Sequence, residues 1–400
     1  MRIIFYTGKG GVGKTSTAAA TACKLASEGN KVLIMSTDQA HSLGDSLDCE
    51  LSYEPKQAAE NLWAMEVDTV RESEKAWGKL HGYMKELLSS HANGGLETEE
   101  LLVFPGLEEL FSLFKILEFY DENKYDVIIV DCAPTGETLS LLKFPEQLGG
   151  FLDKMLPAKR KMVKIAGPAV EKFTKIPMPK DDVFDDLTRL MRKMERMQEL
   201  MDNKKVVSLR IVTTPERIVI QEAKHNFTCL HLYGYLVDAV IVNRIYPTQA
   251  LEGYFSKWIQ LQEESLTQLK ESFGQIPILM LELQERELRG ISSLTQAAEL
   301  LYGKINPMEI LFDDKIMCVE KENGQLVLNL SLPFAEKEDI DLTVQSGELI
   351  LKLKNEKRRF MVPDNLKGKE IEGARYEDGW LKVCYSRDRE PSCTASGPIK

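Results

Sequence analysis

Short runs of apolar residues recur through the first 300 residues of this chain, separated by longer segments with helical spacing. Four of these runs cover residues 2–6, 31–36, 125–131 and 236–242, and a run of small, helix-compatible residues, 15–26, follows the first. Apolar runs of this length, bounded by polar turns, are typical of buried strands. The pattern therefore predicts an α/β fold for the first three quarters of the chain.

The pattern changes near residue 306. Asn306 and Pro307 interrupt the helical spacing of residues 292–301, and beyond them the chain alternates in short runs. The runs cover residues 316–320, 325–331, 340–344, 348–353, 358–361 and 380–384, with turn signals at Asn323-Gly324, Ser346-Gly347 and Asp378-Gly379. Alternating runs separated by such turns are typical of strands. They predict an all-β sandwich over residues 306–386, followed by a polar tail, 387–400.

Residues 149–203 form a long insertion whose two halves differ in composition. The first half interleaves lysine and arginine with large apolar residues, and the second follows Asp181 and Asp182, a predicted N-cap. The apolar residues on one helical face of the second half are Phe184, Leu187, Met191, Met194 and Met201. Two interpretations remain open. One is a helical subdomain packed on the sheet. The other is a flexible, methionine-rich groove for apolar helices, with lysines that suit an anionic membrane surface or an acidic flank of the bound protein.

A glycine-rich loop lies between the first strand and the first helix, where residues 8–15 read Gly-Lys-Gly-Gly-Val-Gly-Lys-Thr. Its glycines let backbone N–H groups close around phosphates, Lys14 reaches the β- and γ-phosphates, and the following helix adds its dipole. Eight matched positions in the order strand, loop, helix distinguish it from a chance glycine-rich turn. The residues expected to contact ATP are Gly8, Lys9, Gly10, Gly11, Val12, Gly13, Lys14, Thr15 and Ser16.

Lys9 is a second lysine in this loop and needs its own explanation. Lys14 already serves the nucleotide of its own subunit, and Lys9 lies too early in the loop to do the same. In loops of this variant kind, the early lysine crosses to the nucleotide of a second copy. We therefore expect a homodimer in which Lys9 and Lys14 are both catalytic.

Two aspartates follow strands that end beside the loop. Asp38 comes after the strand at 31–36 and is suited to hold an attacking water in line with the γ-phosphate, although an Asx turn or a helix N-cap explains it equally well. Asp131 closes the strand at 125–131, where a carboxylate organises Mg²⁺, through water, beside the Thr15 hydroxyl. Residues 132–139 then resemble a loop that changes shape when the γ-phosphate leaves.

Six segments together resemble the arsenical pump-driving and tail-anchored-protein-targeting ATPases. They read GKGGVGKTST, STDQAHSLGDSL, VDCAPTGETLSLL, VTTPE, VNRIYP and ELRG, and the resemblance covers residues 1 to about 305. It implies a doubly wound, mostly parallel sheet, with Asp38 orienting water, Lys9 acting in trans and Asp131 linked to Mg²⁺.

The same resemblance makes Asn243 the side chain that reads adenine. An amide at the end of the strand at 236–242 has a donor and an acceptor for the base. A turn-forming asparagine before Arg244 and Pro247 is the alternative.

The chain departs from this family at three places. Residues 246–273 contain no cysteine, so no zinc is expected between subunits. Glu137 stands where the family usually has histidine, and the cysteines are scattered, which disfavours a metalloid-stimulated pump motor. Gln39 replaces a usual proline and loosens the first switch without removing Asp38.

The sandwich is similar to the α-crystallin domain of small heat-shock proteins over about 75 residues. The resemblance rests on the order LNLSLPFAEKEDIDLTVQSGELILKLKNEKRRFMVP, then YEDGWLKVCY. An unrelated sandwich with similar turns is the alternative. The tail lacks the Ile-x-Ile with which such relatives assemble, so large oligomers are not expected.

The composition of the chain excludes some classes of binding partner and some cellular locations. The chain has 51 Lys and Arg against 62 Asp and Glu, a net charge of −11, which argues against nucleic acid as a general partner. Its seven cysteines form no Cys-x-x-Cys pair, and no apolar run approaches the roughly 20 residues that span a bilayer. With the phosphate loop starting at residue 8, no room remains for a signal peptide. These features predict a cytoplasmic protein.

The sequence thus predicts a Mg²⁺-dependent, ATP-hydrolysing homodimer that acts as a chaperone or targeting factor for hydrophobic protein segments. Its partner is a hydrophobic client helix, with a transient membrane or receptor contact. Two alternatives remain open: an ATPase that drives an anion or arsenite pump, and a holdase that binds clients without ATP turnover.

Overall fold

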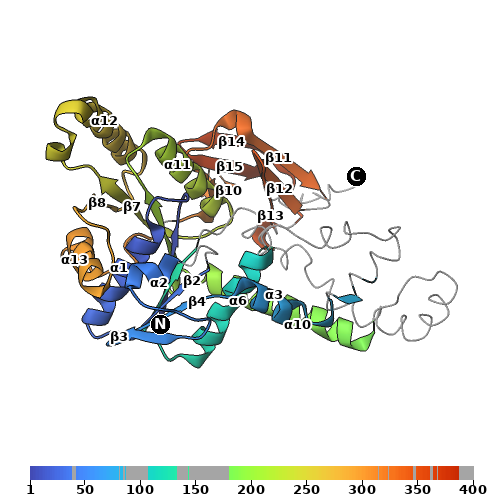
Figure 1. Ribbon diagram of the computed structural model, residues 1–400. Coiled ribbons are helices and arrows are strands. Elements are labelled where there is room, and N and C mark those ends of the chain that lie inside the picture. The colour runs from blue at the N-terminus through green and yellow to red at the C-terminus, as the bar shows by residue number, and fades with distance from the viewer. Residues whose placement is uncertain are drawn as a thin grey trace, which may run out of the picture. The chain divides into compact units, whose positions relative to one another are not determined.

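The computed structural model divides into two compact units, Met1–Asp314 and Lys315–Lys400 (Figure 1). It describes residues 1–37, 42–80, 82–83, 86, 107–132, 143, 180–313, 315–322, 324–345, 348–360, 364–366 and 368–386. Among these residues, no helix combines the length and apolar character needed to cross a membrane.

The first unit is built on an eight-stranded sheet, counted over the described residues, in the order β3-β4-β2-β5-β1-β6-β7-β8. The strands are β1 (Arg2–Thr7), β2 (Val32–Ser36), β3 (Lys56–Ala59), β4 (Leu62–Glu66), β5 (Val127–Asp131), β6 (Val207–Thr213), β7 (Val237–Ile245) and β8 (Ile278–Glu282). Adjacent strands pair in parallel except β3 with β4. The expected doubly wound, mostly parallel sheet is confirmed, and β1 lies in its centre between β5 and β6.

Helices cover both faces of this sheet. They are α1 (Lys14–Ser27), α2 (Ser42–Leu47), α3 (Thr69–Trp77), α6 (Leu107–Glu122), α10 (Asp181–Asp202), α11 (Arg217–Leu232), α12 (Ser256–Ser272) and α13 (Ile291–Tyr302), with short 3₁₀ turns at Thr248–Leu251 and Gly253–Phe255. Since strand side chains alternate between faces, a strand covered on both sides needs a continuous apolar run. Ile3, Ile4 and Phe5 of β1 are accordingly all fully buried.

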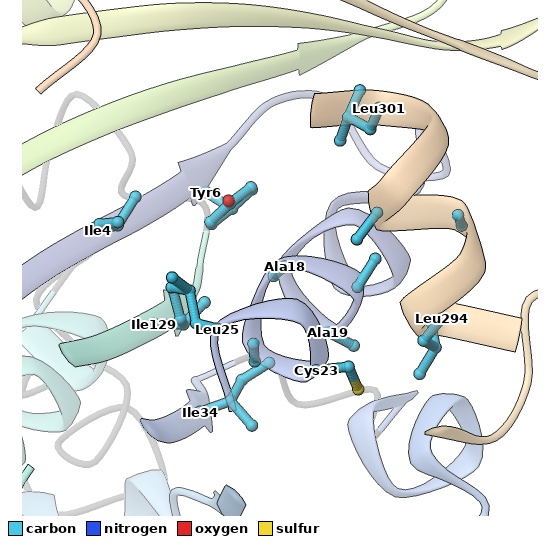
Figure 2. Close-up of a cluster of buried hydrophobic side chains, with 14 of the residues drawn as sticks. Ile4, Tyr6, Ala18, Ala19, Cys23, Leu25, Ile34, Ile129, Leu294 and Leu301 are labelled. Carbon is cyan, nitrogen blue, oxygen red and sulfur yellow. The ribbon is translucent and has the colours of Figure 1, made fainter. Parts of the chain in front are cut away.

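One face of the sheet packs against α1 and α13 (Figure 2). Alanines at positions 18 and 19 keep α1 thin, so that it fits between Ile4 of the sheet and Leu294 and Leu301 of α13. This close packing fixes the start of α1, and therefore the glycine loop before it, relative to the strands.

The methionine face of α10 is part of the core in this structure. Met191, Met194 and Met201 are buried, and α10 contacts α3, α6 and β6. The helix begins at Asp181 with Lys180 as its N-cap residue, so the prediction that Asp181 and Asp182 form the cap is wrong. Both aspartates lie instead in the first turn, where negative charge favours the positive end of the helix dipole.

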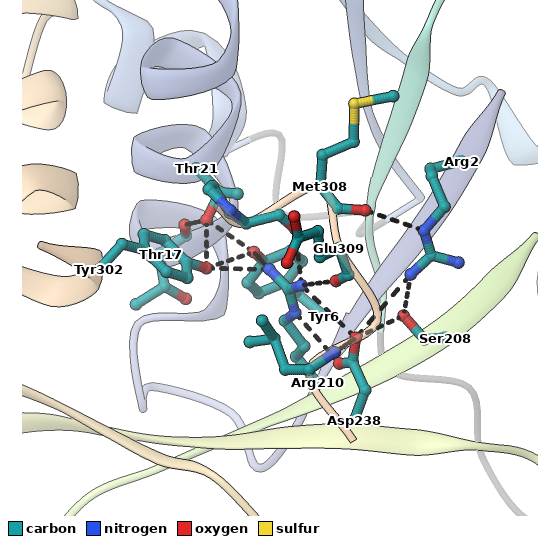
Figure 3. A network of polar contacts seen from close by, with 12 residues as sticks. Arg2, Tyr6, Thr17, Thr21, Ser208, Arg210, Asp238, Tyr302, Met308 and Glu309 are labelled. Atoms are coloured by element: carbon teal, nitrogen blue, oxygen red, sulfur yellow. Dashed lines mark hydrogen bonds and ion pairs between the residues drawn. The ribbon is translucent and has the colours of Figure 1, made fainter. Parts of the chain in front are cut away.

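A buried polar network joins the sheet to the end of the first unit (Figure 3). Arg210 on β6 bonds Asp238 on β7 at 3.1 Å and donates to the Pro307 carbonyl at 2.7 Å. It also donates to the hydroxyls of Tyr6 and Tyr302, at 3.3 and 3.1 Å. Burial alone would lower the pKa of Arg210, but Asp238 and the two tyrosines outweigh it, so the pKa lies well above the usual value.

The network extends to helix α1. The Tyr6 hydroxyl bonds Thr21 of α1 at 2.6 Å and the Tyr302 hydroxyl of α13 at 2.9 Å. Arg2 of β1 donates to the Met308 carbonyl at 3.1 Å. Polar bonds therefore tie helices α1 and α13, the strands β1, β6 and β7, and the segment at 307–309 into one unit.

The second unit is all-β over the described residues, as expected. It has a sheet ordered β14-β15-β10-β9 and a sheet ordered β11-β12-β13, with antiparallel pairs throughout. The strands are β9 (Met317–Glu322), β10 (Gln325–Ser331), β11 (Ile340–Gln345), β12 (Glu348–Leu353), β13 (Glu356–Phe360), β14 (Ile371–Glu377) and β15 (Trp380–Tyr385). The sequence pattern missed β14, because its side chains are mostly exposed and polar and show no alternation.

Candidate functional site

The glycine loop connects β1 to α1 and requires glycine at two positions. A Cβ at Gly13, where φ is +90°, would lie 2.2 Å from the Asn243 amide nitrogen. A Cβ at Gly8 would lie 2.2 Å from the Val212 carbonyl oxygen. At Gly10 a Cβ would meet nothing within 4 Å, so the neighbouring chain leaves that side of the loop open. Val212 of β6 and Asn243 of β7 therefore pack closely against one side of the loop, and the other side is open. We call this arrangement the cradle.

Lys14 begins α1 and lies across the loop. Its Nζ donates to the Lys9 carbonyl at 3.3 Å, and the residue is 8% exposed. The Thr15 hydroxyl lies 3.1 Å from the Ser42 hydroxyl at the start of α2. The first turn of α1 therefore presents a buried ammonium group and a hydroxyl beside the loop, together with the helix N-terminus, which favours anions.

Asp131 closes β5 at the same level as Tyr6 of β1 and Ser36 of β2. Its carboxylate is buried and accepts a bond from the Ser36 hydroxyl at 3.3 Å. Since the carboxyl ends of parallel strands meet at one edge of a sheet, Asp131 lies at the edge where the glycine loop begins. Asp38, two residues beyond Ser36, lies outside the described residues.

The Lys9 side chain reaches helix α11. Its Nζ bonds Oε1 of Glu222 at 2.6 Å, and the two side chains are 41% and 48% exposed. The two lysines of the loop therefore have different surroundings, one buried over the loop and one on the surface. An exposed ion pair of this kind contributes little to stability, so Lys9 can leave it at small cost.

Asn243 is brought against the loop by the end of β7. Its Nδ2 donates to the Val12 carbonyl at 2.9 Å, and its Oδ1 accepts the Arg244 backbone N–H at 2.9 Å. A primary amide has two donors and two acceptor lone pairs, so each end of Asn243 has a further position to offer.

A cavity of about 760 Å³ adjoins this part of the loop. Its lining includes Ser16 from α1, Asn243 and Arg244 from β7, Tyr246, and the segment at 282–289 after β8. Its volume lies in the range of small-molecule sites. Part of this segment belongs to the family motif ELRG at 287–290, to which no role was assigned from the sequence. Its position after the carboxyl end of a core strand is the signal that could have placed it at a binding site.

The segment at 282–289 is joined to α2. Arg289 Nη2 bonds Asp48 at 2.7 Å, just after that helix, and the Gly290 N–H donates to the Ser46 carbonyl at 2.9 Å. These bonds connect the wall of the cavity to α2 and the residues directly after it.

Two buried thiols of the first unit, those of Cys23 and Cys132, are poorly suited to bind soft ions. Burial raises the pKa of Cys23 to about 12 and also raises the pKa of Cys132, so both remain protonated at neutral pH. Thiolates, and not thiols, bind such ions. Over the part of the chain that the structure describes, no group of three or more His, Cys, Asp or Glu residues could hold a metal ion.

Replacing Gly13 by alanine is expected to weaken ATP binding at least about tenfold, because the φ of +90° costs an L-residue roughly 1–2 kcal/mol and the new methyl group displaces Asn243. Titration of a fluorescent ATP analogue measures the effect. Gly373→Ala, whose Cβ would meet no atom within 4 Å, serves as the control. Unchanged affinity of the Gly13→Ala protein would show that the cradle tolerates a side chain there.

Comparison with known proteins accounts for both units. The profile of the family described as anion-transporting ATPase matches residues 1–303, and that of an HSP20-like domain found in ArsA matches residues 323–385. A putative arsenical pump-driving ATPase of Chlorobaculum tepidum is 32% identical over 393 residues, 98% of this chain and 97% of that protein. Putative arsenical pump-driving ATPase 1 of Aquifex aeolicus is 32% identical over 396 residues, 96% of this chain and 100% of that protein.

A third relative matches three quarters of the chain. ATPase ASNA1 homolog 1 of Paramecium tetraurelia is 30% identical over 312 residues, 75% of this chain and 92% of that protein. The two resemblances drawn from the sequence motifs, to the pump-driving and targeting ATPases and to the small heat-shock domain, are confirmed. The chain belongs to the anion-transporting ATPase family, and it is an ATPase that carries an HSP20-like domain after its catalytic unit.

Proposed function

We propose that the chain binds ATP with its phosphates in the loop at 8–15 and its base in the adjoining cavity. The glycines of this cradle, the buried Lys14 side chain and the helix N-terminus suit a polyphosphate. Asn243 lines the cavity and keeps one donor and one acceptor position for adenine while it holds Val12. This cradle is the observation that carries the nucleotide site.

Thr15 and Asp131 are the residues that would hold Mg²⁺, Asp131 through water. A hydroxyl and a carboxylate are the oxygen ligands that this ion prefers, and the buried position of Asp131 at the loop edge of the sheet fits the role. When bound, the ion neutralises charge on the phosphates. The protein supplies the remaining steps: Lys14 holds the terminal phosphates, and Asp38 orients the attacking water.

The working form is a homodimer in which Lys9 acts on the nucleotide of the other subunit. Lys9 is exposed and pairs with Glu222 of α11. In the dimer, Lys9 leaves the Glu222 carboxylate and binds a phosphate of the nucleotide in the other subunit. The ATPase rate then depends on dimer formation, because each active centre is complete only with a cation from its neighbour.

The hydrolysis cycle serves a cytoplasmic chaperone or targeting factor for hydrophobic protein segments, with a transient membrane or receptor contact. Support comes from the HSP20-like domain on the same chain and from the scattered thiols of the catalytic unit, of which Cys23, Cys132 and Cys229 are buried. The methionines of α10 are packed against neighbouring helices, so we assign the client contact to the basic and apolar first half of the insertion, which lies outside the described residues.

A pump-driving function is the second candidate, because relatives that match nearly the whole chain are called putative arsenical pump-driving ATPases. It requires an oxyanion or metalloid to stimulate hydrolysis. The third candidate function is a holdase, which protects clients without ATP turnover. A holdase should bind clients equally well with and without nucleotide.

A labelled apolar helical peptide of about 20 residues separates these functions. We expect fluorescence anisotropy of the full chain with this peptide to show binding that changes between ATP and ADP. The Asp38→Asn protein should retain the peptide in ATP, because it lacks the proposed water-orienting group. A peptide of equal length with its leucines replaced by serine is the control.

Two outcomes would contradict the targeting function. Stimulation of the ATPase by As(III) or Sb(III), with no binding of the apolar peptide, would support the pump-driving function. Equal binding of the peptide with ATP, with ADP and without nucleotide would support the holdase.

A further inference from the structure

The end of strand β7 contains a bulge. Val242 pairs with Met280 of β8, and the next pair joins Ile245 to Glu282, so β7 has one more residue than β8 between the two pairs. Arg244 lies in this bulge with φ of +58°, a conformation that costs a residue other than glycine of the order of 1 kcal/mol. Bulges next to functional sites commonly redirect a side chain.

Here the bulge turns two consecutive side chains toward the glycine loop. Asn243 donates to the Val12 carbonyl at 2.9 Å, and Nη1 of Arg244 donates to the Gly11 carbonyl at 2.8 Å. The Asn243 side chain also accepts the Arg244 N–H, which holds the bulge in shape. Two successive carbonyls of the loop are thus held by two successive residues of β7.

Fixing these carbonyls also fixes the donors of the loop. In a planar trans peptide, the carbonyl of one residue and the N–H of the next point in opposite directions. With the carbonyls of Gly11 and Val12 directed to β7, the N–H groups of Val12 and Gly13 are directed away from it. An anion in the loop needs these N–H groups oriented before it binds, since preorganised dipoles avoid a cost at the moment of binding.

We propose that Arg244 is a positioning residue of the phosphate loop, which acts through the Gly11 carbonyl to hold the loop N–H groups ready for the phosphates of ATP. This inference rests on the proposed nucleotide site. Arginine suits the task because its guanidinium is always charged and gives a strong, directional bond to a carbonyl. Its exposed position at the mouth of the cavity does not bury this charge.

Three substitutions separate the side chain from the strained backbone. Arg244→Gly removes the guanidinium and relieves the cost of positive φ, Arg244→Ala removes the guanidinium and keeps that cost, and Arg244→Lys keeps a charged donor. We expect the Gly and Ala proteins to show a KM for ATP and a Kd for ADP raised about tenfold. We expect the Lys protein to recover most of this loss. The thermal midpoint of Arg244→Gly should not fall.

The controls distinguish loop positioning from other roles. Arg196→Ala removes an exposed arginine that pairs with Asp121 on another helix, and should leave KM and Kd unchanged. Inhibition by adenosine, which lacks phosphates, should be the same in the Arg244 variants and the wild type, because the effect acts on the phosphate loop. A weaker inhibition by adenosine in the variants would overturn the proposal in favour of direct contact with the nucleoside.

Failure of this inference is distinguishable from failure of the nucleotide site. If Arg244→Gly binds and hydrolyses ATP with wild-type constants while Lys14→Ala loses binding, the positioning role is wrong and the site stands. If Lys14→Ala also binds ATP normally, the proposed nucleotide site itself is wrong, and the positioning role is wrong with it.

Discussion

Replacing Lys9 by alanine is expected to lower the ATPase rate about 10³- to 10⁵-fold, the effect of other cations supplied in trans to a phosphoryl-transfer site. Binding of ATP should remain close to that of the wild type, because Lys14 and the loop N–H groups of the same subunit stay in place. The structure motivates the separation: Lys14 lies buried across its own loop, whereas Lys9 bonds Glu222 on the surface. Steady-state phosphate release and equilibrium nucleotide titration measure the two effects independently.

A mixing experiment tests whether Lys9 acts across the dimer. In a mixed dimer of Lys9→Ala and Asp38→Asn subunits, one active centre combines the Asp38 of the first with the Lys9 of the second and is complete. Mixing two nearly inactive proteins should therefore restore hydrolysis. If the mixture stays as inactive as its components although mixed dimers form, Lys9 serves its own subunit and the in-trans arrangement is wrong.

Glu222→Gln is the matched variant for the ion pair itself. It removes the partner of Lys9 without touching the loop, and the exposed pair adds little to stability. We expect a thermal midpoint close to wild type and hydrolysis that is retained, in contrast to the loss in Lys9→Ala. A loss as large as that of Lys9→Ala would assign the catalytic effect to the pair within one subunit.

Replacing Asp238 by alanine is expected to lower the free energy of unfolding of the first unit by about 3–5 kcal/mol. Asp238 and Arg210 are both fully buried and bond at 3.1 Å. Removing the carboxylate leaves the Arg210 guanidinium in the core bonded to hydroxyls and carbonyls but without its charged partner (Figure 3). It also removes the carboxylate that lies 3.8 Å from the Arg2 guanidinium. Urea denaturation followed by circular dichroism measures the loss.

Two further variants identify the cause. Asp121→Ala removes an aspartate of an exposed pair and should change the free energy of unfolding by less than about 1 kcal/mol. Combining Asp238→Leu with Arg210→Met removes both charges and should recover part of the stability, because a buried pair replaced by apolar residues is often neutral. A loss below 1 kcal/mol in Asp238→Ala would show that water or another group compensates Arg210.

The network has a consequence for the site. It bonds Tyr6 of the central strand to Thr21 of α1, the helix whose first turn carries Lys14 and Thr15. Because the same arginine bonds the Pro307 carbonyl, the segment that leaves the catalytic unit is anchored to the strands beneath the loop. Loss of Asp238 is therefore expected to disturb nucleotide binding as well as stability.

Local sequence patterns were sufficient for elements whose environment is uniform. Strands covered on both faces need apolar side chains at every position, so Ile3, Ile4 and Phe5 identified β1 directly. Strand β14 was missed because its exposed side chains carry no pattern. The methionine face of α10 left two interpretations open, since a core stripe and a binding groove have the same spacing, and only its packing against α3 and α6 assigned it to the core.

The sequence by itself determined the α/β and all-β division, the family, and the loop that begins at Gly8, because these depend on the order and spacing of residues along the chain. Only the tertiary structure revealed the cavity beside Ser16, the different surroundings of Lys9 and Lys14, and the hold of Arg244 on Gly11. Gly11 and Arg244 are 233 positions apart. A bond between residues so far apart forms because the sheet brings β1 and β7 close together and because the bulge in β7 redirects Arg244. Neither the strand order nor the bulge can be predicted from a local sequence pattern.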